Sequence, residues 1–256
     1  MADNILTAKG LTLRFGGLTA INDVGFEIRK NEIVGLIGPN GAGKTTLFNI
    51  VTGIYAPNAG YIDYKGQSLL NKAPYEITAH GISRTFQNIR LFGNMTVIEN
   101  VMVGMHVKTK SSMLDDIFKT PAHRRVEKEA EAEAEKLLEL TGLSEYKYHY
   151  ATSLSYGLQR RLEIARAMAS SPELILLDEP AAGMNEMETD ALTAFIKQIN
   201  KLGYTILLIE HDMRLVMKIC DRIYVLDHGV LISEGTPSKV KSDPRVIEAY
   251  LGKEVS

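Results

Sequence analysis

The chain has 256 residues, of which 45% are hydrophobic and 23% charged, and its formal net charge is −2 at pH 7. This length and composition are typical of a globular protein that buries a substantial core, as one large domain or two closely joined lobes. The charge balance argues against nucleic acid as a partner, because nucleic-acid-binding domains usually carry a basic face.

We expect neither disulfides nor membrane-spanning segments. Cys220 is the only cysteine, so no intrachain disulfide can form, and its apolar helical neighbours predict a packed core thiol. The first residues lack the basic and apolar regions of a signal peptide. The uncharged apolar runs 174–177 and 206–209 are far shorter than a bilayer span. Any membrane role must therefore come through a partner.

The first 80 residues predict several strands and two helices. Residues 5–30 form two alternating apolar runs on either side of two glycines, which predicts an antiparallel pair of strands. An apolar run at 32–37 predicts a buried strand, residues 45–51 a helix, and residues 60–64 a further β segment. Residues 74–81 predict a short helix.

A glycine-rich loop joins the predicted strand at 32–37 to the helix at 45–51. Residues 38–46 match G-x-x-x-x-G-K-[ST] at every fixed position, and consecutive amides at a helix N-terminus form a cradle for polyphosphate. Lys44 is expected to reach the β- and γ-phosphates, and the Thr45 hydroxyl to ligate Mg²⁺. We therefore predict a nucleoside triphosphate site. Its expected binding residues are Gly38, Asn40, Gly41, Ala42, Gly43, Lys44, Thr45 and Thr46.

The middle of the chain is predicted to be helical. Between about residues 100 and 143, Ala130, Ala134 and Leu138 recur at helical spacing, and the glutamate run 127–139 is expected to form the solvated face. A second helix is expected at 156–169. We interpret residues 81–165 as an α-helical subdomain inserted into a core made of 1–80 and 166–256.

The last third alternates strands and helices, which implies parallel strands with crossover helices. We expect strands at 174–177 and 205–209, helices at 186–202 and 213–219, and a hairpin at 223–232. The predicted fold class is α/β: a phosphate-loop NTPase core with an N-terminal antiparallel β subdomain and an inserted α-helical subdomain, all within one domain.

Two carboxylates follow the predicted strand at 174–177. Asp178 ends the strand and is expected to hold Mg²⁺ through water, as in other phosphate-loop enzymes. Glu179 is a candidate general base for the attacking water. The alternative is a buried strand that ends in an ordinary turn. The phosphate loop upstream favours the catalytic interpretation.

The order of these motifs resembles the ATP-binding cassette (ABC) family across nearly the whole chain. The family has a phosphate loop, a Q-loop glutamine (here Gln87), a signature (154–161), an Asp-Glu strand, a D-loop (181–185) and a switch histidine (His211). The Tyr-Gly signature, the run Asp-Glu-Pro-Ala-Ala-Gly and the extra segment 104–125 resemble the LivG-type ATPases of branched-chain amino acid importers.

The resemblance implies that two cassettes pair head to tail around two ATP molecules, with Mg²⁺ at each site. Ser155 and Gly157 would then face the γ-phosphate bound by the partner cassette. His211 would contact the γ-phosphate, and Gln87 would touch Mg²⁺ or the water and act in catalysis with Lys44, Glu179 and His211. Phe15 would stack on adenine. The alternative for Phe15 is a strand core position.

The resemblance also implies partners and a location. The partners are a second ABC ATPase subunit, which is a different cassette or this chain itself, two transmembrane permease subunits, and an external solute-binding protein reached through the permease. The location is peripheral, at the cytoplasmic face of the inner membrane. Ile89, Leu91 and Phe92 either grip a short helix of the membrane subunit or pack the helical subdomain.

Three positions depart from the family pattern. Tyr156 and Leu158 stand where the usual Leu-Ser-Gly-Gly-Gln signature has glycine and glutamine, and Asn185 stands where the D-loop usually has aspartate. A partner cassette with a better signature would compensate. Two other functions remain open: a soluble ABC ATPase of iron–sulfur assembly, which membrane association would exclude, and a lipid or lipopolysaccharide exporter ATPase, which Tyr156 and the segment 104–125 disfavour.

Overall fold

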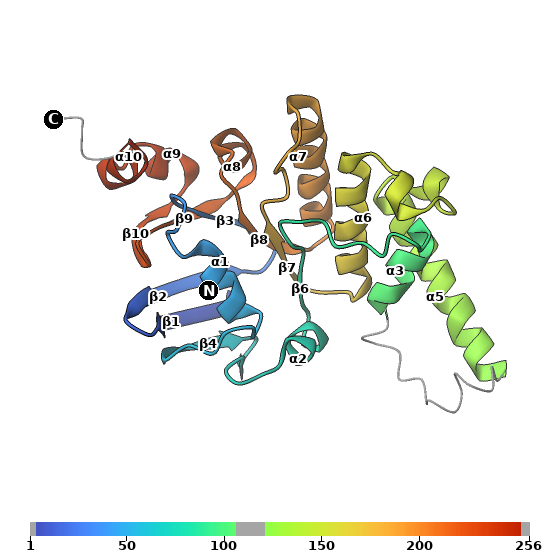
Figure 1. Ribbon diagram of the computed structural model, residues 1–256, viewed down its shortest axis with the longest axis horizontal. Helices are drawn as coiled ribbons and strands as arrows, with labels where there is room; N and C mark the ends of the chain where they lie inside the picture. The colour runs from blue at the N-terminus through green and yellow to red at the C-terminus, as the bar shows by residue number, and fades with distance from the viewer. Residues whose placement is uncertain (1–3, 106–120, 252–256) are drawn as a thin grey trace.

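The computed structural model of the chain describes residues 4–105 and 121–251. Its strands form two sheets (Figure 1), one with the order β2-β1-β4-β5 and one with the order β10-β9-β3-β8-β7-β6. The first sheet is antiparallel, and the second is parallel except for β10. The strands are β1 (Asn4–Phe15), β2 (Leu18–Arg29), β3 (Ile33–Ile37), β4 (Ala59–Tyr64), β5 (Gln67–Ser68), β6 (Ile82–Arg84), β7 (Leu174–Asp178), β8 (Thr205–Ile209), β9 (Arg222–Asp227) and β10 (Val230–Gly235).

Some helices connect the parallel strands, and others form a separate group at one end of the molecule (Figure 1). They are α1 (Lys44–Val51), α2 (Pro74–Ala79), α3 (Val97–Met105), α5 (Pro121–Leu140), α6 (Tyr156–Ala169), α7 (Glu186–Lys201), α8 (Met213–Ile219), α9 (Pro237–Lys241) and α10 (Pro244–Leu251), with short 3-10 turns at Ser144–Tyr146 and Ala151–Ser153.

The larger sheet is buried on both faces. Because successive side chains of a strand point to opposite faces, Leu36 and Leu207 pack with α1 and the smaller sheet, whereas Ile37 and Leu208 pack with the helices on the other side. This explains why β3, β7 and β8 are continuous apolar runs. Helix α1, which begins at the phosphate loop, is thereby enclosed between the two sheets.

A third apolar cluster joins α3, α5 and α6. Ala134 and Leu138 of α5 are buried in it, while the glutamates in the run 127–139 are mostly exposed, as the helical spacing predicts. Helix α6 also contributes Ile164 and Met168 to the core beneath the larger sheet. The helix that carries the signature is therefore packed against both parts of the molecule.

Most of the predicted elements are confirmed, including the N-terminal antiparallel pair, the crossover helices, the hairpin and the buried Cys220. One difference is β6, which lies in the segment predicted to be helical but pairs with β7 as the edge strand of the larger sheet. Most of the extra segment 104–125 lies outside the described residues.

Candidate functional site

The phosphate loop runs from the carboxyl end of β3 to the first residue of α1. Gly43 is the N-cap of α1 with φ 103°, and a Cβ there would lie 2.8 Å from Ile21 Cδ1. A Cβ on Gly38 would lie 2.0 Å from the carbonyl oxygen of Leu226. Both positions therefore require glycine, because the loop backbone is pressed against β2 and β9.

Lys44 is the buried cation of this loop. Its Nζ donates hydrogen bonds to the carbonyl oxygens of Gly38 (2.7 Å) and Pro39 (2.9 Å). Burial lowers the pKa of the Lys44 ammonium, and the nearby carboxylates of Glu179 and Asp178 oppose that shift. A cleft of about 450 Å³ opens beside it. Its lining includes Phe15, residues 40–46, Glu179 and His228. Such a cleft suits a polyanion.

Asp178 ends β7 and forms a buried ion pair with Arg84 at the end of β6. Arg84 Nη2 lies 2.6 Å from Asp178 Oδ2, and the two side chains are 7% and 5% exposed. Arg84 Nη1 also donates to Asn49 Oδ1 of α1 at 2.7 Å. Sequence reasoning assigned Arg84 no role, because no local pattern shows that β6 and β7 are neighbours.

Glu179 is the point where three predicted motifs meet. Gln87 Nε2 donates a 2.7 Å hydrogen bond to Glu179 Oε2, and His211 Nδ1 lies 3.7 Å from the same oxygen. Glu179 has a φ of 45°, which is rare for a residue with a Cβ, and its amide donates to the carbonyl of Ile209. The carboxylate is thus held in place while still 20% exposed.

Glu210 is a buried acid that joins the loop after Glu179 to the segment bearing His211. It is 0% exposed, and its carboxylate accepts hydrogen bonds from the amides of Ala181 (2.7 Å) and His211 (3.1 Å). Burial raises the pKa of Glu210, and these backbone hydrogen bonds oppose the shift. Sequence analysis gave Glu210 no role beyond its place before the histidine.

The signature residues do not line the phosphate-loop cleft. Ser155 is the exposed N-cap of α6, and within the described chain its side chain accepts no capping hydrogen bond. Gly157 follows in the first turn and is partly exposed. Asn185 of the D-loop caps α7, because its Oδ1 accepts a hydrogen bond from the amide of Glu188.

Residues 21–182, more than half of the chain, match the family model described as ABC transporter. The chain belongs to the ABC transporter family. Residues 230–256 match a second model, described as branched-chain amino acid ATP-binding cassette transporter. The chain is therefore an ABC ATPase, as its motifs predict.

Several ABC proteins are similar in sequence to this chain along nearly its whole length. The high-affinity branched-chain amino acid transport ATP-binding protein LivG of Salmonella typhimurium is 50% identical over 99% of this chain and 100% of its own length. BraF of Pseudomonas aeruginosa, with the same description, is 47% identical over 99% and 100%. A solved ATP-binding cassette of an ABC transporter in its ADP conformation is 33% identical, with a TM-score of 0.84 over 98% of this chain and 100% of that chain.

An exporter ATPase is also similar to the cassette, but less so. The lipopolysaccharide export system ATP-binding protein LptB of Haemophilus influenzae is 34% identical over 98% of this chain and 98% of its own length. The chain is therefore more similar to the branched-chain amino acid transport proteins LivG and BraF than to this lipopolysaccharide export protein.

Phe15 lies at the end of β1, at the rim of the cassette's phosphate-loop cleft. Its ring is 46% exposed and packs edge-to-face on Tyr55, with centroids 5.2 Å apart. The strand-core interpretation of Phe15 is therefore wrong, because a core ring would be buried. Stacking on adenine stays a prediction.

His228, 91% exposed at the β9–β10 turn, also lines the cleft, and its sequence context indicated only a turn.

The fit of Mg²⁺ to the ABC site rests on oxygen donors. The described residues contain no group of three or more His, Cys, Asp or Glu that could hold a metal ion. Mg²⁺ in nucleotide sites is typically held by one or two protein oxygens together with phosphate oxygens and water. Thr45, Gln87 and Asp178 supply such donors, and Asp178 lies close enough to Lys44 to influence its pKa.

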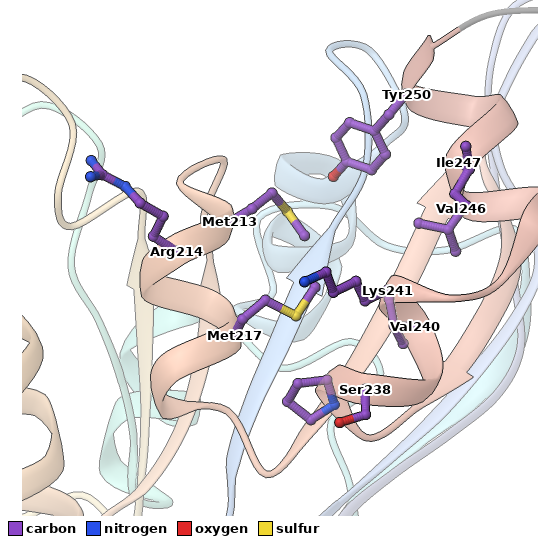
Figure 2. Close-up of a pocket in the computed structure, with 10 residues that line it drawn as sticks. Met213, Arg214, Met217, Ser238, Val240, Lys241, Val246, Ile247 and Tyr250 are labelled. Carbon is purple, nitrogen blue, oxygen red and sulfur yellow. The ribbon is translucent and has the colours of Figure 1, made fainter.

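A second pocket of the ABC cassette lies between α8 and the pair α9–α10 (Figure 2). Its volume is about 590 Å³, and Met213 and Met217 of α8 point toward Lys241 and Tyr250. Its lining is mainly apolar and includes none of the predicted site residues, so the polyphosphate site is better placed at the phosphate loop.

None of the described helices is long and apolar enough to span a membrane.

Proposed function

We propose that this chain is the ATP-hydrolysing subunit of an importer for branched-chain or related amino acids. The observation that carries the proposal is the meeting of Gln87 and His211 at the Glu179 carboxylate, beside the buried Lys44 of a phosphate loop. The identity of about half of all residues to LivG and BraF along the full chain supports the substrate class.

Residues 38–46 bind the triphosphate in this proposal. Lys44 exchanges its hydrogen bonds to the backbone carbonyl oxygens of the loop for hydrogen bonds to phosphate oxygens. The buried ammonium then has charged acceptors in place of neutral backbone acceptors. Phe15 offers its exposed face to the adenine. Thr45, Gln87 and Asp178 would hold Mg²⁺, which when bound neutralises charge on the β- and γ-phosphates and orients them.

Glu179 acts as the general base of hydrolysis. Its carboxylate accepts a proton as the water oxygen bonds to the γ-phosphorus and the bond from phosphorus to the bridging oxygen breaks. The hydrogen bond from Gln87 orients this carboxylate. His211 follows the carboxyl end of β8, the parallel neighbour of β7, and contacts the γ-phosphate from there, while Glu210 fixes the backbone that carries it.

A second cassette completes each ATP site. Ser155 and Gly157 sit at the N-terminus of the 14-residue helix α6, where free amides and the helix dipole favour an anion. They do not line the chain's own cleft, which is consistent with their contacting ATP on a partner cassette. The partner is a different cassette or a second copy of this chain.

The permease docks at a groove of about 600 Å³ between the larger sheet and the helical group. Phe92 in this groove is 46% exposed, with the Arg166 guanidinium 5.5 Å from its ring centroid, while Leu91 is half-buried against the α3–α5–α6 cluster. We therefore assign permease docking to Phe92 and packing of the helical subdomain mainly to Leu91, which also lines the groove. Two permease subunits, fed by an external solute-binding protein, would hold the chain at the cytoplasmic face of the inner membrane.

The test is to isolate the chain from gently solubilised native membranes and identify its companions. We expect two multi-span proteins and a second cassette ATPase, and ATP-driven uptake of a branched-chain amino acid by vesicles that contain the complex. Recovery of the chain only in the soluble fraction, with a scaffold protein that does not span membranes, would contradict import and favour ATP-driven assembly.

A further inference from the structure

The side chain of Tyr156 is 40% exposed and contacts the chain's own D-loop. Its hydroxyl donates a hydrogen bond of 2.9 Å to the carbonyl oxygen of Ala182. Its ring lies close to Gly183, where an added Cβ would come within 3.8 Å of the ring atoms. The bulk that distinguishes Tyr156 from the usual glycine therefore lies against residues 182–183, and Ser155 remains exposed.

The same hydroxyl also contacts a buried arginine one turn further along α6. Arg160 Nη2 lies 3.4 Å from the Tyr156 hydroxyl oxygen. The two Nη atoms of Arg160 donate to the carbonyl oxygens of Phe86 and Gln87, each at 2.7 Å. The arginine is 0% exposed, and its charge is balanced by Glu163 at 2.7 Å. It therefore fixes the backbone of the Q-loop.

These contacts close a ring around Glu179. Gln87, whose carbonyl Arg160 holds, donates its side-chain amide to the Glu179 carboxylate at 2.7 Å. Ala182, whose carbonyl Tyr156 holds, donates its own amide to the Glu179 carbonyl at 3.1 Å. The Glu179 backbone has a φ of 45°, and such a conformation persists only where surrounding contacts over-determine it.

We propose that the Tyr156 hydroxyl is a positioning group for Glu179, linking the signature helix, the Q-loop and the D-loop within one cassette. This inference rests on the proposed role of Glu179 as the general base. Because Ser155 lies beside Tyr156 and faces outward, the ring connects the surface expected to meet the partner's ATP to the chain's own base. Tyrosine at this signature position thus has a function of its own and is not merely tolerated.

The test uses the full-length chain with Tyr156→Phe, which removes the hydroxyl and keeps the ring. We expect kcat for ATP to fall about three- to tenfold, as for the loss of one neutral hydrogen bond, with KM changed less than about twofold. Amide exchange of residues 179–185 should rise, because the D-loop loses an anchor. Tyr156→Gly, which also lacks the hydroxyl, should show the same changes.

The matched control is Tyr75→Phe, which removes a hydroxyl from the exposed ring of Tyr75 on α2. It should leave kcat and exchange at residues 179–185 unchanged. The inference is overturned if Tyr156→Phe has wild-type kcat and exchange, or if it changes only Tm and KM. If Glu179→Gln hydrolyses ATP as fast as the wild type, the proposed function fails instead, and the two failures are thereby distinguished.

Discussion

The side-chain amide of Gln87 donates a 2.7 Å hydrogen bond to the carboxylate of Glu179, 92 positions away in the chain. The two residues meet because β6 and β7 are parallel neighbours, so the segments that follow them leave the sheet at the same edge. A carboxylate oriented in this way at the mouth of a phosphate-loop cleft is suited to receive a proton from water.

Glu179→Gln should bind ATP but not hydrolyse it. The substitution keeps the shape of the side chain and removes its basicity, and a general base typically contributes a factor of at least about 100 to the rate. ATP affinity should change less than about threefold, because the phosphate loop is intact. Single-turnover hydrolysis and equilibrium ATP binding measure the two effects. Glu248→Gln, on the exposed side of α10, is the control. Hydrolysis above a tenth of the wild-type rate would contradict the role.

Phe15→Ala should weaken ATP binding about five- to tenfold, since stacking of a base on an aromatic ring is worth roughly 1–3 kcal/mol. The Tm should hardly change, because the ring is 46% exposed. Phe15→Trp should retain affinity. Tyr61→Ala is a matched control, since Tyr61 is a similarly exposed aromatic residue (45%) on the same sheet. Equal affinities of Phe15→Ala and wild type would exclude adenine stacking.

Leu91→Ser and Phe92→Ser should have different effects. Phe92 is exposed in the proposed docking groove, so Phe92→Ser should abolish ATP-driven uptake and leave ATP binding and Tm close to wild type. Leu91 packs against the helical cluster, so Leu91→Ser should lower the free energy of unfolding by about 1–2 kcal/mol. The double variant should show both effects. Uptake by vesicles and urea unfolding test them, and retained uptake in Phe92→Ser would refute the docking site.

Arg84→Leu should lower the free energy of unfolding by about 3 kcal/mol, because it leaves the Asp178 carboxylate buried without its cation. Arg214→Leu is the matched control. Its ion pair with Glu186 has the same 2.6 Å separation, but the two side chains are 73% and 75% exposed, so a loss below about 1 kcal/mol is expected. Urea unfolding compares the two variants. Equal losses would show that burial does not determine the strength of the Arg84–Asp178 pair.

The contribution of Glu210 to stability should decline as pH rises. Burial raises the pKa of Glu210 in the folded chain, so above about pH 4.3 the unfolded chain releases this proton first. The contribution is full below that pH and is lost as pH rises through the folded-state pKa. Glu210→Gln has no such titration. The unfolding free energy of the wild type minus that of the variant should therefore fall as pH rises above about 4.3, and a rise would contradict the assignment.

Local patterns in the sequence predicted the elements that local forces dominate. The helical pattern at 156–169 matches α6, and the apolar runs match β3, β7 and β8. The phosphate loop could be predicted because its hydrogen-bond donors are consecutive backbone amides in one short segment. Strand β6 was missed, because three residues carry no periodicity and become a strand only where β7 offers an edge.

The tertiary structure decided which residues meet and which way side chains face. The alternation of β1 cannot show whether its last residue, Phe15, lies under the second sheet or beyond it, and the packed sheets leave it exposed. The pairs Gln87–Glu179 and Arg84–Asp178 depend on strand order, and Tyr156–Ala182 depends on how α6 packs beside the D-loop.

By itself, therefore, the sequence determined the fold class, the nucleotide and the ABC family, since these follow from contiguous motifs and from periodicities that span only a few residues. Only the tertiary structure decided how Glu179 is held, which residue forms an ion pair with Asp178 and where the Tyr156 ring points. Those contacts join segments far apart in the chain, and their free energies depend on strand register and burial, which no local stretch of sequence encodes.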